Sequence, residues 1–210
     1  MKAIAFAVRV IANFIMREEW ISLQNRVDDA LRAVSAIPGR LEQELLICGE
    51  DHRFFRHAGI DLISVVRALW RCWIQHRIEG ASTIEMQVVR VLTGRYERTW
   101  RRKLREMALA TLLSEYVGKS PLPSLYLYIG YYGWRMNGLS QARRRLGIKN
   151  WSHLDHARLV ARLKYPEPRM MTSNRAHQIE RRAEHLLSLH ARYSAAGAFK
   201  ALKIQVYGAV

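Results

Sequence analysis

The stretch EDHRFFRHAG, residues 50–59, decides how the rest of the chain is interpreted. It places two carboxylates, two histidines, two arginines and two aromatic rings directly after the apolar run LLIC at 45–48. If this segment is helical, Glu50, Phe54 and His57 fall on one face and Gly59 ends the helix. A carboxylate beside apolar rings has a raised pKa, which suits a general base. The alternative is a solvated charge cluster at the end of a helix.

Composition limits the class of protein. A chain of 210 residues, half of them hydrophobic and a quarter charged, is globular and long enough for one domain with a complete core. Its formal net charge of +16 implies an anionic partner, such as nucleic acid, an acidic membrane surface or a phosphorylated substrate. Residues 86–150 contain thirteen Lys and Arg against three acids, so we expect that partner to bind there.

Apolar residues recur at helical spacing along most of the chain, without an alternating strand pattern of useful length and without an internal repeat. The segment 124–142, rich in Tyr and Gly, is typical of a loop-and-helix wall that lines a groove. The sequence therefore predicts a mainly α fold. Helices are expected at 1–16, 17–44 (ending near Pro38), 41–57, 60–78, 94–118, 151–163 and 175–192.

Two apolar segments each allow a membrane role or a core role. Residues 1–16 form an amphipathic pattern too short to span a bilayer, which lies in a membrane interface or caps the core. Residues 60–78 carry two tryptophans with arginines between them, as in a core helix or a helix that touches lipid. Cys48 and Cys72 either form one disulfide or remain free thiols, and no CxxC or HExxH spacing indicates a metal site.

Two short motifs each allow both a structural and a functional interpretation. In GASTIEMQ, residues 80–87, Ser82 and Glu85 have the spacing of a capping box, and a helix N-terminus also binds phosphate. In RRKLRE, residues 101–106, Glu106 lies one turn from Arg102 and Lys103. That pattern fits solvated ion pairs, or a carboxylate held among cations beside a phosphate site.

Taken in order, these motifs resemble the family 51 glycosyltransferases, the peptidoglycan glycosyltransferase domains of bifunctional penicillin-binding proteins and of monofunctional transglycosylases. EDHRFFRHAGID at 50–61 resembles the family pattern ED-x-x-F-x-x-H-x-G, and GASTIEMQ at 80–87 resembles G-x-STITQQ. RRKLRE at 101–106 is similar to RK-x-x-E. YLYIGYYG at 126–133 and LDHARLVARLKYPEP at 154–168 resemble the fourth and fifth motifs.

The resemblance implies a lysozyme-like helical fold with a larger head lobe and a small apolar jaw lobe. The expected organisation is membrane-proximal helices at 1–40, a glycosyltransferase domain at 41–192 and a tail at 193–210. The implied enzyme polymerises lipid II into β-1,4-linked glycan strands with inversion and releases undecaprenyl pyrophosphate. It would lie peripherally on the periplasmic face of the bacterial inner membrane, with lipid II, the growing strand, the membrane surface and cell-wall synthesis proteins as partners, and without nucleic acid.

By the same resemblance, Glu50 is the general base and Glu106 acts at the donor pyrophosphate, directly or through Mg²⁺ or Mn²⁺. No organic cofactor is expected. A pyrophosphate leaving group gains negative charge as its bond breaks, so clustered cations stabilise the transition state. The cations assigned to this role are Arg90, Arg98, Arg102 and Lys103. The other residues assigned to substrate binding are Asp51, Phe54, His57, Ser82, Thr83 and Gln87.

Four positions depart from the family pattern. Glu85 and Met86 replace Thr-Gln in the second motif, Tyr128 replaces Asn in the fourth, and His156 replaces Glu in the fifth. Both principal carboxylates remain, but these changes motivate a second hypothesis, a silent relative that binds lipid-linked precursor or scaffolds cell-wall assembly. Two further classes are a glycan-cleaving enzyme that uses Glu50 as general acid and a helical nucleic-acid-binding protein.

Overall fold

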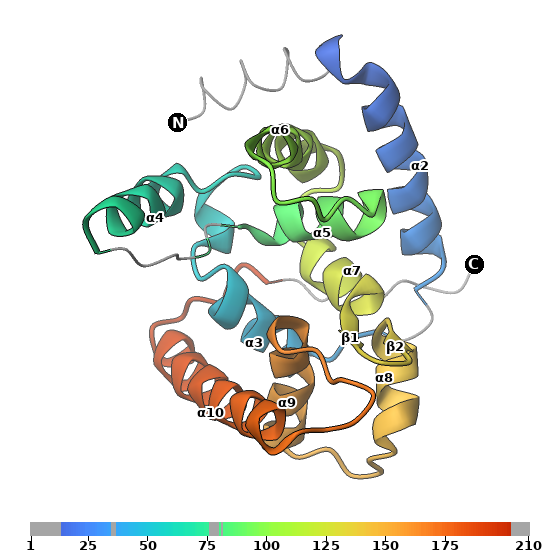
Figure 1. The fold of residues 1–210 in the computed structure, drawn as a ribbon, viewed down its shortest axis with the longest axis vertical. Coiled ribbons are helices and arrows are strands. Elements are labelled where there is room, and N and C mark those ends of the chain that lie inside the picture. Colours follow the sequence, from blue (N-terminus) through green and yellow to red (C-terminus); the bar gives the residue numbers. More distant parts are fainter. Residues whose placement is uncertain (1–13, 35–36, 76–79, 81, 203–210) are drawn as a thin grey trace. The chain divides into compact units, whose positions relative to one another are not determined.

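A computed structural model of the chain describes residues 14–34, 37–75, 80 and 82–202. In this part of the chain the structure is mainly α-helical, with a single short strand pair, which confirms the predicted fold class (Figure 1). The chain divides into two compact units. The first contains the described residues of Met1–Asp29 and Arg53–Leu122, and the second those of Ala30–His52 and Pro123–Val210.

The first unit is built on the packing of two helices, α5 against α6. Its elements are α2 (Arg17–Arg32), the 3-10 turn η1 (Phe54–Arg56), α4 (Leu62–Gln75), α5 (Ile84–Thr93) and α6 (Trp100–Tyr116). Helix α2 buries Trp20, Leu23 and Val27, and the Trp20 ring meets the Tyr116 ring edge-on at 5.7 Å. Gly59 has a positive φ of 92°, and a Cβ there would lie 2.4 Å from the carbonyl oxygen of Ala110. The loop after η1 therefore needs glycine to approach α6.

The second unit is held together by α10, which packs on α9 and on α3. Its elements are α3 (Arg40–Glu50), α7 (Leu122–Ile129), β1 (Tyr131–Gly133), β2 (Met136–Asn137), α8 (Leu139–Leu146), α9 (His153–Lys164) and α10 (Ser173–Ala195). The antiparallel strands are only three and two residues long. One core cluster gathers Tyr132, Met136, Leu139, Ala142 and Leu159, all fully buried.

The helix expected at 41–57 is wrong in its second half. Helix α3 ends at Glu50, because Asp51 leaves the helical region with φ −155° and ψ 70°. A turn and the short η1 follow, so Glu50, Phe54 and His57 do not share one helical face. Cys48, near the end of α3, is a buried free thiol, which excludes the disulfide alternative. Burial, with a smaller contribution from Glu44, raises the pKa of the Cys48 thiol to about 12.

Helix α4 exposes an apolar face, so the core-helix interpretation is wrong for this face. Ile63, Val66, Trp70, Trp73 and Ile74 are all exposed, and Trp73 keeps 85 % of its surface accessible. Their spacing places them on one side of the helix. Among the described residues, no helix combines the length and the apolar character that crossing a bilayer requires. The first thirteen residues of the expected amphipathic helix lie outside the described part of the chain.

Candidate active site

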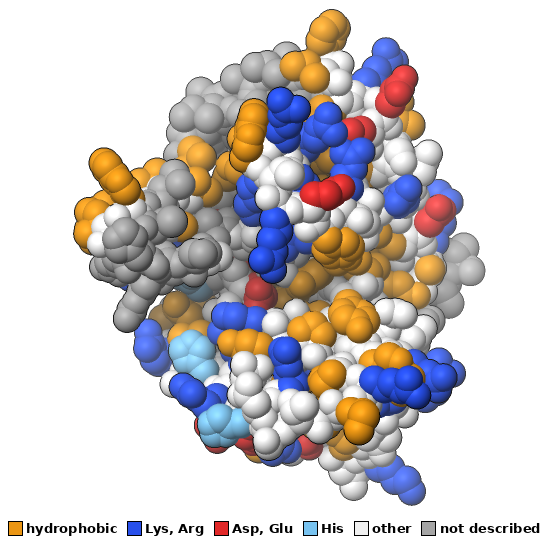
Figure 2. Space-filling view, in the orientation of Figure 1, with side chains coloured by type: hydrophobic (Ala, Val, Ile, Leu, Met, Phe, Trp, Pro, Cys, Tyr) orange, Lys and Arg blue, Asp and Glu red, His pale blue; other side chains and the backbone are white. Residues whose placement is uncertain are grey.

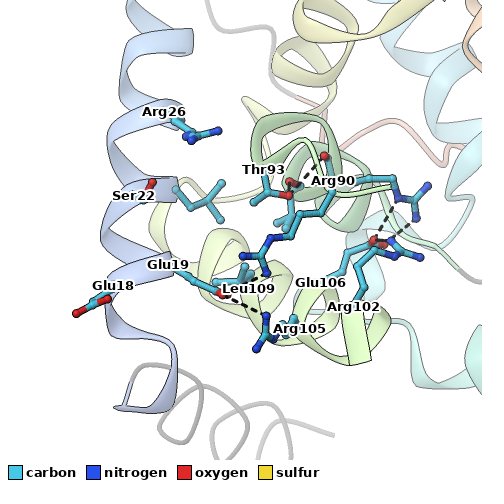
Figure 3. Close-up of a pocket in the computed structure, with 13 residues that line it drawn as sticks. Glu18, Glu19, Ser22, Arg26, Arg90, Thr93, Arg102, Arg105, Glu106 and Leu109 are labelled. Carbon is cyan, nitrogen blue, oxygen red and sulfur yellow. Dashed lines mark hydrogen bonds and ion pairs between the residues drawn. The ribbon is translucent and has the colours of Figure 1, made fainter. Parts of the chain in front are cut away.

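The centre of the first unit's site is the carboxylate of Glu106, which is 3 % exposed (Figure 3). Thr99 caps α6 by accepting a bond from the Arg102 backbone N–H at 3.2 Å, which sets the start of the helix. Arg102 and Lys103 then lie one turn before Glu106. Arg102 Nη1 pairs with Glu106 Oε2, and Lys103 Nζ lies 3.3 Å from Oε1. From α5, Arg90 binds both oxygens, with Nη2 at 2.7 Å and Nε at 3.1 Å.

One hydroxyl joins the second sequence motif to the third. Ser82 Oγ accepts bonds from Lys103 Nζ at 2.7 Å and from Arg90 Nη2 at 3.2 Å. The capping box predicted between Ser82 and Glu85 is wrong, because Thr83 caps α5 and accepts a bond from the Met86 N–H at 3.3 Å. The start of the helix one residue later leaves Ser82 to the cation cluster.

Positive charge at this site exceeds what Glu106 can neutralise, since three cations surround one carboxylate. Burial lowers the pKa of Lys103, and the charges of Arg90 and Arg102 lower it further against the attraction of Glu106. A cavity of about 290 Å³ is lined by Arg90, Arg102 and Glu106 of this cluster, without Lys103, and also by Glu18 and Glu19 (Figure 3). Such an excess of cations beside a cavity suits a multiply charged anion.

A divalent ion at Glu106, the metal option raised by the sequence, does not fit this arrangement. Both carboxylate oxygens already accept bonds, from Arg90, Arg102 and Lys103. Mg²⁺ and Mn²⁺ bind free oxygen ligands, and three neighbouring cations would repel them. In the first unit, the positive charge available to a bound anion comes from Arg and Lys side chains.

Glu85, the acid that departs from the family motif, has its own cation. It is fully buried on α5 and pairs with Lys119 Nζ, a partner that sequence reasoning missed. Lys119 Nζ also lies 4.3 Å from the centre of the Phe54 ring and 3.4 Å from His57 Nδ1. No local pattern marks Lys119, because it lies 34 positions from Glu85.

The remaining predicted residues of the first unit have different positions. Thr83 is buried, and its hydroxyl donates to the Gly59 carbonyl at 2.7 Å, so it ties α5 to the loop after η1. Gln87 is buried on α5, 9 % exposed. Arg98 is exposed in the segment between α5 and α6, and within the described chain it makes no bond to Glu106.

In the second unit, Glu50 is the last residue of α3 and keeps 20 % of its side chain exposed. Its partner is Arg182 of α10, whose Nη2 lies 3.1 Å from Glu50 Oε1 and 2.6 Å from the Gly49 carbonyl oxygen. Asp51, the next residue, is buried at the C-cap, and its backbone N–H donates to the Ile47 carbonyl at 3.0 Å. Sequence reasoning missed Arg182, since it lies 132 positions from Glu50.

Gly49 allows this pairing. A Cβ at this position would lie 2.4 Å from Leu186 Cδ2 and 2.9 Å from Arg182 Nη2. The missing side chain therefore leaves room for the Leu186 and Arg182 side chains against α3, where Arg182 reaches Glu50.

Two other departures have structural partners in the second unit. His156 Nδ1 lies 3.0 Å from Oε1 of the fully buried Glu42, which also binds Arg143 Nη2 at 2.8 and 2.9 Å. The hydroxyl of Tyr128 donates to the Ala33 carbonyl at 2.6 Å. Burial and the Glu42 charge raise the pKa of the neighbouring Tyr132 well above its usual value. These substitutions belong to the packing of the unit.

A family model described as Transglycosylase matches residues 17–190. The chain belongs to the transglycosylase family. It is 33 % identical over 125 residues to penicillin-binding protein 1A of Rickettsia bellii, covering 58 % of this chain and 16 % of that protein.

It is also 33 % identical over 129 residues to penicillin-binding protein 1C of Escherichia coli, covering 61 % of this chain and 16 % of the relative. The corresponding figures for penicillin-binding protein 1F of Bacillus subtilis are 33 % over 111 residues, 52 % and 15 %. The chain therefore spans about one sixth of the length of these relatives.

Proposed function

We propose that this chain is a peptidoglycan glycosyltransferase that polymerises lipid II into β-1,4-linked glycan strands and releases undecaprenyl pyrophosphate. Membership of the transglycosylase family supports the reaction class. The observation that carries the proposal is the buried Glu106 carboxylate bound by Arg90, Arg102 and Lys103. Because Glu106 holds these cations in place before substrate binds, they can stabilise a leaving group that becomes more negative.

On the donor side, the bond between the anomeric carbon and the pyrophosphate breaks while negative charge accumulates on the phosphate oxygens. Arg90, Arg102 and Lys103 stabilise that charge more in the transition state than in the ground state. Glu106 offsets the mutual repulsion of the three cations and fixes their positions. Ser82, bound to two of these cations, is placed to donate its hydroxyl proton to a phosphate oxygen.

On the acceptor side, Glu50 takes the proton of the GlcNAc 4-hydroxyl as the oxygen attacks the anomeric carbon with inversion. A positioned base of this kind contributes roughly 10²–10⁴-fold in rate. Arg182 orients the Glu50 carboxylate through its bonds to Oε1 and to the Gly49 carbonyl. Asp51, Phe54, Thr83 and Gln87 are buried and act mainly by stabilising the unit to which each belongs, while His57 lies beside Lys119.

The lipid part of the substrate requires a membrane surface, and α4 suits one. Its exposed apolar residues surround a shallow cavity of about 590 Å³ lined by Leu62, Ile63, Val66, Arg67 and Trp70. Tryptophan and arginine together are typical of the lipid–water interface. We place the protein peripherally on the periplasmic face of the inner membrane, where cell-wall synthesis proteins are its natural partners.

Of the four substitutions that motivate a silent precursor-binding relative, three have structural partners: Lys119 for Glu85, Ala33 for Tyr128 and Glu42 for His156. The fourth, Met86, is fully buried on α5. They therefore give little reason to expect lost turnover. The excess of cations around Glu106 likewise favours a phosphorylated donor over the glycan-cleaving alternative, whose substrate carries no pyrophosphate. The exposed apolar face of α4 is unexplained in a nucleic-acid-binding protein.

The proposal is tested with purified protein, labelled lipid II and gel separation of the products. Glu50→Gln should reduce polymer formation by at least about 10²-fold because the base is lost, while the helical circular dichroism stays unchanged. Glu184→Gln removes an exposed carboxylate from α10 and serves as the matched control. Polymer formation at the wild-type rate by Glu50→Gln would reject the base assignment. Lipid II binding without turnover by the wild-type protein would instead select the silent relative.

A further inference from the structure

A third cavity, of about 590 Å³, lies in the second unit where the end of α9 meets α10. Every residue that lines it is polar or aromatic, five are basic and none is acidic: Lys164, Tyr165, Asn174, His177, Gln178, Arg181, Arg182 and His185. In the space-filling view, Lys, Arg and His side chains gather over α10 (Figure 2). The cavity beside Glu106, by contrast, includes acids in its lining. A cavity with this lining attracts anions.

The sequence of α10 creates the basic lining. Thr172 caps the helix by accepting a bond from the Arg175 N–H at 3.2 Å, which sets its first turn. From there His177, Arg181 and His185 follow at four-residue intervals and lie on one face. Burial lowers the pKa of His185, and the charges of Arg182, Lys164 and Arg192 lower it further. His185 therefore reports a positive potential that a bound anion would reduce.

One wall of this cavity is the residue that holds the proposed base. Arg182 is 11 % exposed and is fixed by Glu50 and by the Gly49 carbonyl oxygen. Arg182 thus both lines the cavity and binds the Glu50 carboxylate. Asn174 and Gln178 add amide groups that can bind a peptide backbone, which a site for a lone phosphate does not need.

We propose that this cavity is a subsite for the acceptor, in which the basic side chains bind a carboxylate of the peptide stem of lipid II. The inference rests on the proposed function, because it places the acceptor hydroxyl at Glu50. The stem hangs from the sugar next to the one that carries this hydroxyl, so a carboxylate-binding cavity beside Arg182 would align the acceptor for attack. Arg181, Lys164 and His185 are specificity residues in this account, and Arg182 is a positioning residue.

Binding is tested by NMR titration of the His185 ring in the full chain, with the free stem pentapeptide as the first probe. Bound peptide should raise the pKa of His185. The double variant Lys164→Gln/Arg181→Gln should weaken binding by about tenfold or more, since charge-assisted bonds are lost. Arg144→Gln/Lys149→Gln removes the same charge from exposed positions in and after α8 and should leave binding unchanged. An unperturbed His185, or equal binding by both double variants, would overturn the subsite.

Inorganic phosphate is the second probe, and anionic lipid vesicles are the third. Peptide binding that excess phosphate does not displace supports a carboxylate subsite. A response to phosphate or vesicles but not to peptide would overturn it. In the polymerisation assay, Lys164→Gln/Arg181→Gln should raise the KM for lipid II and leave kcat nearly unchanged. If the wild-type chain binds the peptide but makes no polymer, the proposed function fails and the peptide subsite stands. If it polymerises lipid II but does not bind the peptide, the subsite fails and the proposed function stands.

Discussion

The buried carboxylate of Glu85 is paired with the ammonium of Lys119, and its second oxygen, Oε2, accepts no hydrogen bond within the described residues. Glu85 is fully buried, whereas Lys119 keeps 22 % of its side chain exposed. This pair explains how an acid is tolerated on α5, the helix that also carries Arg90. Its charge is neutralised inside the first unit by a lysine in the segment between α6 and α7.

Lys119→Met should destabilise the protein by roughly 3 kcal/mol, because it leaves a buried charge without its partner. In the background of Glu85→Gln the same change should cost far less, since no charge remains to be neutralised. A double-mutant cycle measured by urea unfolding gives the coupling between the two side chains. Strictly additive losses would show that the pair is not coupled.

The lowered pKa of Lys103 predicts that activity falls at alkaline pH. Burial and the charges of Arg90 and Arg102 lower its pKa from 10.5, so Lys103 loses its proton at a lower pH than a free lysine. If its charge stabilises the leaving group, polymerisation should decline as pH rises through that lowered value. Lys103→Arg should move this alkaline limb to higher pH, because a guanidinium keeps its proton. Lys149→Arg is the exposed control, and an identical limb in all three proteins would contradict the assignment.

Restoring the family residue at position 156 should harm this chain. His156→Glu would place a second carboxylate beside the buried Glu42, where His156 Nδ1 now lies 3.0 Å from Oε1. Like charges at this separation repel, and we expect a loss of roughly 2 kcal/mol or more in the free energy of unfolding. His156→Gln, which keeps a donor, should lose less. Thermal unfolding followed by circular dichroism checks the order, and equal stability of the two variants would contradict it.

Asp61 fixes the start of α4 and predicts a pH dependence of stability. Its burial raises the pKa, but hydrogen bonds from Ser64 and the charge of Arg53 outweigh that effect, so the pKa lies below its usual value. A lowered pKa means that the stabilisation is complete above the unfolded-state pKa and is lost as pH falls through the folded-state value.

Asp61→Asn should therefore cost about 1 kcal/mol near neutral pH, the typical worth of a helix cap, and almost nothing in strong acid. Urea unfolding at the two pH values measures the difference. A constant loss at both would show that the charge of Asp61 does not matter.

The helices were predictable where local signals agree. The helices expected at 94–118, 151–163 and 175–192 are present as α6, α9 and α10, whose starts are capped by Thr99, Ser152 and Thr172. The separate helix α8 was not predicted. The family resemblance predicted that Arg90, Arg102, Lys103 and Glu106 act together, and the packing of α5 against α6 brings them into contact.

What local reasoning missed depends on contacts that are distant in sequence. The end of α3 at Glu50 was not predicted, because the charged and aromatic residues at 50–57 match a helical spacing. In the structure, Phe54 lies beyond α3 and is buried in the first unit. Lys119 and Arg182 become partners of Glu85 and Glu50 only through the packing of helices. The exposed face of α4 could not be separated from a core face by composition alone, since both are equally apolar.

The missing side chain at position 49 makes room for the arginine that binds the proposed base. Gly49→Ala would add one carbon where Leu186 Cδ2 and Arg182 Nη2 now lie, so both side chains would have to shift. The proposed base would then lose the placement of its partner, although both principal acids remained. A substitution at position 49, outside the charged residues of the site, could thus abolish activity while all the sequence motifs remained unchanged.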